Sequence, residues 1–455
     1  MGEVAQTRPR AFSVGFRGLK TWSVAAQFAV NWNWPEEVIK PLASILSRRN
    51  EAALETLTPE SMVTLLTIRF DGSIEPREPV RIKDIKGRLF RVYSGDVVFS
   101  KIDVRNGAIG LAPDDIDCMC VTSEFPVYSV DFAKTDSGYV KLLFRTAAFK
   151  KLLNSMISGA SGRKRIQPTQ LEGVKVPIPP LPIQQKIVGY WEAAQTSVQR
   201  SHESMSNSKA EAFDQFRKAL GIKKSSAARP KLFITKWREV ERWGIELAWR
   251  NKNGTDSFVY PVKPLKGVCK TGSGGTPSRN HKEYYGGEIP WVKTTEVRNA
   301  VIYDTEEKIT NMALASSSAK LYPAGSLVIA MYGQGATRGR TAKLGVDAAT
   351  NQACLVLTEI DPALDTDFLW YYLMVSYDEM RGLASGNNQP NLSADLLSGF
   401  PIPIPPATRQ TELKTLFEVS QRKVAELEKQ IALIRNQTTK EIERMILGIH
   451  QVEAH

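Results

Sequence analysis

The chain has 455 residues, of which 42% are hydrophobic and 24% charged, a globular composition long enough for about two or three hydrophobic cores. Its net charge of +12 and pI near 9.4 favour a polyanionic partner such as nucleic acid, although lysines that serve only solubility are an alternative. No apolar run reaches the roughly 18 residues of a membrane span, and the basic start lacks the apolar segment of a secretory signal, so we expect a cytoplasmic protein.

The first third of the chain predicts a basic arm and a mixed domain. We expect residues 1–20 to form the arm and residues 21–182 to form a first α/β domain. Residues 61–70 predict a strand before an Asp71-Gly72 turn. Further strands are expected at 89–93 and 96–102, and the apolar spacing of residues 139–156 predicts an amphipathic helix.

Two long helices are predicted in the rest of the chain. Apolar residues recur at every third or fourth position in residues 183–222, with a partly heptad seam, so this segment is expected to be a central spacer helix. Residues 408–455 carry a similar apolar stripe and are expected to form a C-terminal spacer helix.

Between these helices, residues 223–407 predict a second domain that repeats the order of the first. Its start, at 222–231, reads as a linker. The expected elements are strands within residues 261–270, 288–297 and 322–330, and a helix over residues 366–382.

A proline-rich decapeptide marks the repeat. Residues 171–180 return as residues 397–406, an offset of 226 that also aligns Gln184 with Gln410. A period this long exceeds that of a solenoid unit, which runs roughly 20 to 50 residues, so it indicates two copies of a whole domain.

The order of elements predicts the fold class. A lone amphipathic helix of this length is unstable, and the simplest way to bury the apolar stripe of each long helix is to pack it against the other long helix. We therefore expect an α+β protein in which two pseudo-repeated mixed α/β domains are joined by two long antiparallel helices that form a coiled coil. The alternative is that each helix folds back on its own domain.

Motifs for catalysis and for metal or nucleotide binding are missing. The four cysteines and four histidines are scattered, so we expect reduced thiols and no metal site. The glycine runs at 272–275 and 333–341 do not fit the phosphate-binding pattern GxxxxGK[ST], and we find no methyltransferase or nuclease motif. The sequence thus predicts a chain without an active site.

Four loops that combine basic residues, amides and glycine are the candidate DNA contacts. Arginine and amide side chains can bond base edges bidentately, whereas lysine and backbone amides neutralise phosphates. For any single residue, a merely hydrophilic turn is the alternative. The candidate residues are Lys101, Arg105, Asn106, Arg163, Lys164, Arg165, Gln167, Lys293, Thr294, Gln334, Arg338, Arg340, Asn387, Asn388 and Gln389.

Several motifs of the second domain resemble one known family. They are Gly274-Gly-Thr-Pro-Ser278, Tyr284-Tyr-Gly-Gly-Glu-Ile-Pro-Trp-Val-Lys-Thr-Thr-Glu-Val297, Ser385-Gly-Asn-Asn-Gln-Pro-Asn-Leu-Ser393 and Ile402-Pro-Ile-Pro-Pro-Ala-Thr-Arg-Gln410. The family is the DNA-specificity subunit of Type I restriction-modification systems. This resemblance implies two target-recognition domains that each read one half of a split double-stranded DNA site, and two spacer helices that dock methyltransferase subunits. It also implies a role in phage defence.

The resemblance further implies that this chain holds no cofactor. S-adenosylmethionine would belong to the modification subunits, and ATP with Mg to the restriction subunits. The first domain lacks the Gly-Gly-Thr-Pro-Ser and Ile-Pro-Trp motifs, so the two half-sites are expected to differ. Alternatives are a DNA-recognition subunit of another phage-defence or modification complex, and a self-contained DNA-modifying enzyme with unrecognised motifs.

Overall fold

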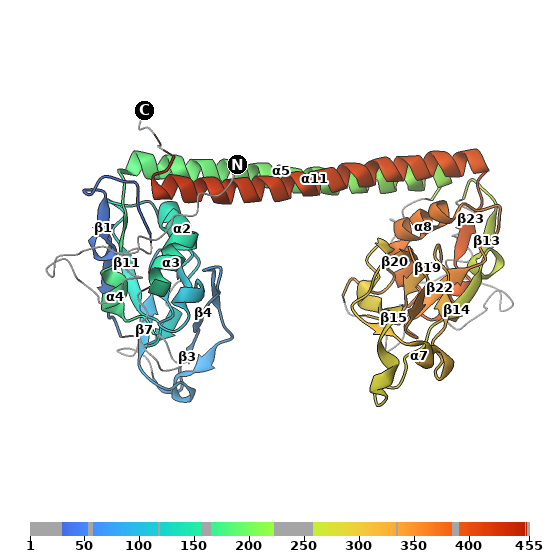
Figure 1. The fold of residues 1–455 in the computed structure, drawn as a ribbon, viewed down its shortest axis with the longest axis horizontal. Helices are drawn as coiled ribbons and strands as arrows, with labels where there is room; N and C mark the ends of the chain where they lie inside the picture. The colour runs from blue at the N-terminus through green and yellow to red at the C-terminus, as the bar shows by residue number, and fades with distance from the viewer. Residues whose placement is uncertain are drawn as a thin grey trace, which may run out of the picture. The chain divides into compact units, whose positions relative to one another are not determined.

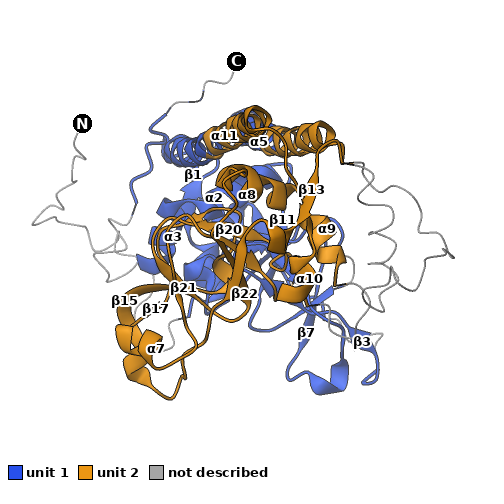
Figure 2. Cartoon of the chain, turned by 90° about the vertical axis from the view of Figure 1, so that its right-hand side faces the viewer, with its two compact units in different colours: residues 1–201, 429–455 blue, residues 202–428 orange. Residues whose placement is uncertain are grey.

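The computed structural model describes residues 30–52, 58–116, 119–155, 165–222, 258–333, 335–384, 391–450 and 452. The expected basic arm lies outside these residues. The chain divides into two compact units, which Figure 2 colours separately: unit 1 comprises residues 1–201 and 429–455, and unit 2 comprises residues 202–428. Each unit combines a sheet-containing body with one end of each of two long helices, which confirms the predicted α+β class.

The central sheet of unit 1 has four antiparallel strands in the order β2-β11-β8-β9. Their bounds are Leu46–Arg49 (β2), Val127–Val130 (β11), Val97–Phe99 (β8) and Ile109–Leu111 (β9). Strand β8 is fully buried, with Val97 and Phe99 in one hydrophobic cluster and Val98 in another. This alternation follows from the two-residue period of a strand and places a core on each face of the sheet.

Short strand pairs complete the body of unit 1. The predicted strand at 61–70 is split into two pieces, and the predicted turn at Asp71-Gly72 is confirmed by the left-handed φ of +81° at Gly72. The pairs join Met62–Val63 (β3) with Val80–Arg81 (β6), Leu66–Ile68 (β4) with Ile74–Pro76 (β5), and Leu89–Val92 (β7) with Met119–Thr122 (β10).

The helix predicted over residues 139–156 is two helices, α2 (Ser137–Arg145) and α3 (Ala147–Ser155). Thr146 interrupts it, because its ψ of 144° is incompatible with a continuing helix. The backbone nitrogens of Ala147 and Ala148, free at the new helix start, both donate to the Glu443 carboxylate at 2.8 Å. The prediction of a single helix was therefore wrong at Thr146.

Unit 2 repeats the sheet order of unit 1. Its sheet runs β14-β22-β19-β20-β16, in which the first four strands are antiparallel and β16 is parallel to β20. The bounds are Lys270–Ser273 (β14), Cys354–Thr358 (β22), Leu327–Ala330 (β19), Thr341–Leu344 (β20) and Val301–Ile302 (β16). Strands β8 and β9 of unit 1 thus correspond to β19 and β20.

A second sheet in unit 2 has the order β17-β15-β21-β18. It consists of Lys308–Ile309 (β17), Tyr285–Val292 (β15), Ala348–Thr350 (β21) and Leu321–Tyr322 (β18). Helix α7 (Asn311–Ala315) packs beside it. The helix predicted over 366–382 is again broken, here at Ser376, into α8 (Thr366–Val375) and α9 (Tyr377–Gly382).

The repeated proline-rich segment forms the same structure twice. Strand β12 (Lys175–Pro177) pairs with β1 (Ile39–Pro41), and β23 (Pro401–Pro403) pairs with β13 (Val262–Pro264). A short helix precedes each of these proline-rich strands, α4 (Pro168–Glu172) before β12 and α10 (Ala394–Ser398) before β23. Since proline lacks an N–H, these strands stay at a two-stranded edge before a long helix begins.

The long helices are α5 (Leu181–Leu220) and α11 (Ala407–Leu447), which run alongside each other within each unit (Figure 1). In unit 1, Ile187 at the start of α5 shares a core with Ile446 at the end of α11. In unit 2, Phe213 near the end of α5 stacks on Phe417 near the start of α11, with ring centroids 5.6 Å apart. The pairing is antiparallel, as predicted, and each helix end also packs against the body of its unit.

Among the described residues, no helix combines the length and apolar character that a membrane crossing requires. The cysteines within this part of the chain, Cys120, Cys269 and Cys354, are buried and unbridged. Burial raises the pKa of the Cys269 thiol to about 11.

Candidate nucleic-acid interface

The loop between β8 and β9 carries the first group of predicted DNA contacts in unit 1. Lys101 donates from Nζ to the carbonyl of Ser123 at 2.6 Å. Asn106 is exposed, and its amide lies 3.4 Å from the Asp103 carboxylate. Arg105 is half-buried, and within the described residues its Nε–H has no hydrogen-bond acceptor. Arg105 is thus a half-buried loop arginine with one buried donor left unsatisfied, and it could use that donor toward DNA only if its side chain turned outward.

The second predicted loop of unit 1 lies against the first. The backbone nitrogen of Ile166 donates to the Lys101 carbonyl at 2.9 Å. Arg165 is exposed and lies 3.4 Å from Glu124, and the exposed Gln167 precedes helix α4. Arg163 and Lys164 lie outside the described residues. The structure thus brings Lys101, Arg105, Asn106, Arg165 and Gln167 into one neighbourhood.

In unit 2, the corresponding loop joins β19 to β20 and holds Arg338 and Arg340. Both arginines are half-buried, and the buried Nε–H of Arg338 has no acceptor within the described residues. Burial, followed by the nearby positive charge of Arg381, lowers the pKa of Arg338. An anion beside this loop would relieve both effects, which suits a contact with DNA.

The other predicted loop of unit 2 is only partly described. Leu392, which follows it, donates from its backbone nitrogen to the Met331 carbonyl at 3.1 Å, so its end lies beside the β19–β20 loop. The predicted contacts that lie outside the described residues are Gln334, Asn387, Asn388 and Gln389.

Lys293 is engaged in ion pairs within unit 2. Its ammonium lies 3.3 Å from Glu306 and 3.2 Å from Glu307, and only 23% of its side chain is exposed. Burial opposes its charge, but the hydrogen bonds with both glutamates outweigh that effect and raise the pKa of Lys293. The neighbouring Thr294 is half-buried at the start of a 3-10 helix. Lys293 therefore presents a neutralised charge rather than a free one.

Sequence reasoning missed two arginines that hold these loops. Arg145, at the end of α2, donates from Nη1 to the carbonyl of Gly107 at 2.9 Å. Arg381, in α9, donates from Nη1 to the carbonyl of Gly335 at 2.8 Å and to that of Arg338 at 3.0 Å. Each reads in the sequence as an ordinary charged residue of an amphipathic helix, and no local signal names its partners.

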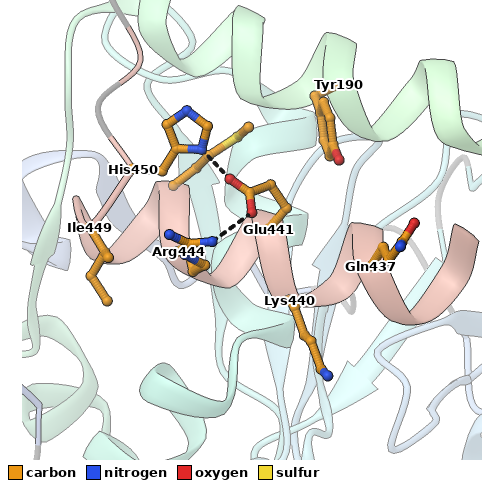
Figure 3. Close-up of a pocket in the computed structure, with 8 residues that line it drawn as sticks. Tyr190, Gln437, Lys440, Glu441, Arg444, Ile449 and His450 are labelled. Carbon is orange, nitrogen blue, oxygen red and sulfur yellow. Dashed lines mark hydrogen bonds and ion pairs between the residues drawn. The ribbon is translucent and has the colours of Figure 1, made fainter. Parts of the chain in front are cut away.

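An open hollow beside the ends of α5 and α11 in unit 1 is a different kind of feature (Figure 3). Its lining includes Lys440 and Arg444, but Glu441 accepts a hydrogen bond from Arg444 at 3.4 Å and pairs with His450. Arg444 and His450 thus already face a carboxylate, and Lys440 points away from it (Figure 3), so the hollow does not gather its positive groups toward one ligand.

Comparison with known proteins gives one consistent result. The family model described as Type I restriction modification DNA specificity domain matches residues 90–195 and 260–443, which is more than half of the chain.

Two curated relatives are specificity subunits of Type I restriction enzymes. That of MjaIX from Methanocaldococcus jannaschii is 26% identical over 191 residues, covering 41% of this chain and 42% of the relative. That of EcoR124I/EcoR124II from Escherichia coli is 27% identical over 162 residues, covering 34% of this chain and 39% of the relative. The matches thus span about two fifths of each relative's length.

A solved structure shares the fold. It comes from a study of complex assembly and conformational transition of the type I R-M system, and it aligns with a TM-score of 0.58 at 15% identity. The alignment covers 91% of this chain and 97% of the solved chain.

Proposed function

Because the chain belongs to the family of Type I restriction modification DNA specificity domains, we propose that it selects the DNA site for a Type I restriction-modification complex. The observation that carries this proposal is the pair of corresponding loops, β8–β9 in unit 1 and β19–β20 in unit 2. Each holds a half-buried arginine, Arg105 or Arg338, whose buried Nε–H has no acceptor among the described residues. Nothing within the unit satisfies this donor, and a guanidinium that turns toward a duplex can bond a guanine edge or a phosphate.

The site we propose is bipartite and asymmetric. The loop of unit 1 reads Lys101-Ile-Asp-Val-Arg-Asn-Gly107, and that of unit 2 reads Met331-Tyr-Gly-Gln-Gly-Ala-Thr-Arg-Gly-Arg340. Loops so different in length and side chains offer different donors to DNA. Each unit therefore reads its own half-site.

We further propose that the chain is non-catalytic and acts as a scaffold. In this proposal it binds double-stranded DNA together with two methyltransferase subunits, and with restriction subunits where the system has them. S-adenosylmethionine, ATP and Mg would bind those partners. Its lack of recognised catalytic motifs and its family membership support this division of labour.

The test is to map methylated bases by sequencing DNA from cells that express the chain together with its genomic partner subunits. We expect one motif made of two dissimilar half-sites at a fixed spacing, and no methylation when this chain is omitted. Methyl transfer by the purified chain alone would identify it as a self-contained enzyme and overturn the proposal. Methylation of the same motif in cells that lack the chain would also overturn the proposal.

A further inference from the structure

The guanidinium of Arg145 in unit 1 donates hydrogen bonds to three backbone carbonyls. Nη1 donates to Gly107 at 2.9 Å and to Phe70 at 3.3 Å, and Nη2 donates to Ile109. Gly107 lies at the end of the β8–β9 loop, Ile109 is the first residue of β9, and Phe70 lies in the turn between β4 and β5. One side chain therefore ties the candidate recognition loop both to an adjacent hairpin and to helix α2.

Arg381 of unit 2 makes an equivalent set of bonds from α9. Its Nη1 donates to the carbonyls of Gly335 and Arg338 in the β19–β20 loop, and to the Tyr377 hydroxyl at 2.8 Å. That hydroxyl in turn donates to the carbonyl of Ala336 at 2.7 Å. Three carbonyls of the loop, those of Gly335, Ala336 and Arg338, are thus held by two side chains of one short helix.

The loop backbones fit closely around these arginines. Gly339 has a φ of +85°, and a Cβ there would lie 2.9 Å from Cγ of Arg381. Gly107 has a φ of +108°, and a Cβ there would lie 2.1 Å from the Phe70 carbonyl oxygen and 3.5 Å from Nη1 of Arg145. In both loops, a glycine with a left-handed backbone lets the chain approach the arginine.

We infer that Arg145 and Arg381 are positioning residues for DNA recognition, each of which fixes the loop that presents Arg105 or Arg338 to its half-site. This inference rests on the proposed function. Arg145 uses two nitrogens of its planar guanidinium to hold carbonyls in one geometry, and Arg381 uses its Nη1 on two loop carbonyls, so these donors support the loops rather than contact a base. A loop ordered before binding loses less entropy when it meets DNA.

The test in unit 2 compares the full chain, assembled with its partners, with its R381A and Y377F variants. We would measure affinity for the duplex selected from a random DNA pool, and for two duplexes that are each scrambled at a different half-site, across a range of salt concentrations. Y377F changes no charge but removes the hydroxyl that links Arg381 to Ala336. The control is R409A, because Arg409 pairs with Glu412 on its own helix at 2.6 Å, away from the loop.

For R381A we expect discrimination of the half-site read by unit 2 to fall roughly 5- to 150-fold, the range of one bidentate base contact. Discrimination of the other half-site and the salt dependence should stay as in the wild type, since no phosphate contact is lost. Y377F should show a smaller loss in the same direction, and R409A none. R145A should mirror R381A at the half-site read by unit 1.

Two results would overturn the inference. If R381A weakens the selected and scrambled duplexes equally and lowers the salt slope by about 0.9, Arg381 is a direct phosphate contact. If R381A or Y377F has the melting temperature of the wild type and discriminates between the duplexes as strongly as the wild type does, the loop does not need the support of Arg381 and Tyr377. Should R381A not fold, Y377F alone decides. A wild-type complex that fails to discriminate the selected duplex from the scrambled ones would instead count against the proposed function.

Discussion

Gln184 and Gln410 occupy matching positions at the start of the two long helices, and their buried amides make corresponding hydrogen bonds. Oε1 of Gln184 accepts from the backbone nitrogen of Asp136 at 2.9 Å, and Oε1 of Gln410 accepts from that of Asp365 at 2.7 Å. Each Nε2 donates to a carbonyl of the proline-rich segment, at Pro179 and Pro405. Since Asp136 and Asp365 are the N-caps of α2 and α8, each glutamine joins a long helix to its unit's body.

Replacing Gln410 by alanine is expected to destabilise unit 2 by roughly 1 to 3 kcal/mol, because buried peptide groups lose their partners. Chemical denaturation followed by circular dichroism would measure the change in free energy of unfolding. Q184A should have a similar effect on unit 1. The matched control is Q437A, an exposed glutamine of α11, which should change stability by less than about 0.5 kcal/mol. Equal effects of Q410A and Q437A would contradict the role given to the buried amide.

Replacing Arg338 by alanine is expected to reduce DNA specificity without reducing the stability of the fold. The change removes a donor proposed to reach DNA and also relieves the repulsion with Arg381, so thermal stability should be unchanged or slightly higher. Specificity at one half-site should relax by roughly 1 to 3 kcal/mol if the contact is bidentate. Methylation mapping with R338A checks this, and R105A should relax the other half-site. A motif unchanged in both variants would argue against these contacts.

Lys101 is expected to act on all DNA sequences alike. If its ammonium exchanges the Ser123 carbonyl for a phosphate, K101A should weaken specific and scrambled duplexes by the same factor. The salt slope should also become shallower by about 0.9. Binding isotherms at several salt concentrations measure both quantities. A loss confined to the specific duplex would make Lys101 a base contact.

The Asp365–Lys414 ion pair, 2.7 Å long, is expected to make unit 2 sensitive to acid. Burial opposes the charge of Asp365, but hydrogen bonds from Lys414 and from the backbone of α8 outweigh it and lower the pKa of Asp365 below 3.8. A lowered folded-state pKa means that this stabilisation is present above the unfolded-state pKa and is lost as the pH falls through the folded-state value. Below about pH 4, the wild type should therefore lose stability faster than D365N.

Thermal melts of the wild type and D365N at several pH values would measure this difference. The effect should be modest, because the pair is partly exposed and screened by solvent. The two curves should converge as the pH falls, and parallel curves from neutral pH to pH 3 would contradict the assignment.

The central spacer helix offers a test of the bipartite reading. Because α5 is continuous from Leu181 to Leu220, inserting one helical turn within residues 197–212, with a compensating turn in α11, should change the spacing between half-sites. The half-site sequences should stay the same. Methylation mapping would report both, and altered half-sites at an unchanged spacing would refute the spacer role.

The sequence predicted the features set by local pattern and by repetition. The apolar stripes of α5 and α11 and the Asp71-Gly72 turn depend on neighbours a few residues away. The helix break at Thr146 could not be predicted, because Glu443, which accepts from the first nitrogens of α3, lies 295 residues later. The same holds for the candidate site: Arg105 and Arg338 stood out as loop arginines, whereas Arg145 and Arg381 depend on carbonyls 36 to 75 residues away.

The closure of the unit 1 core by Ile442, Met445 and Ile446 has a consequence for the order of events during synthesis. The ribosome makes residues 1–201 first, but residues 429–455 of the same unit come last. At about 5 to 20 residues per second, the intervening residues 202–428 impose a delay of roughly 10 to 45 s. During that interval unit 2 is synthesised, while the apolar surface of unit 1 that the end of α11 covers stays uncovered. The half of the protein that begins first is thus the last to finish folding.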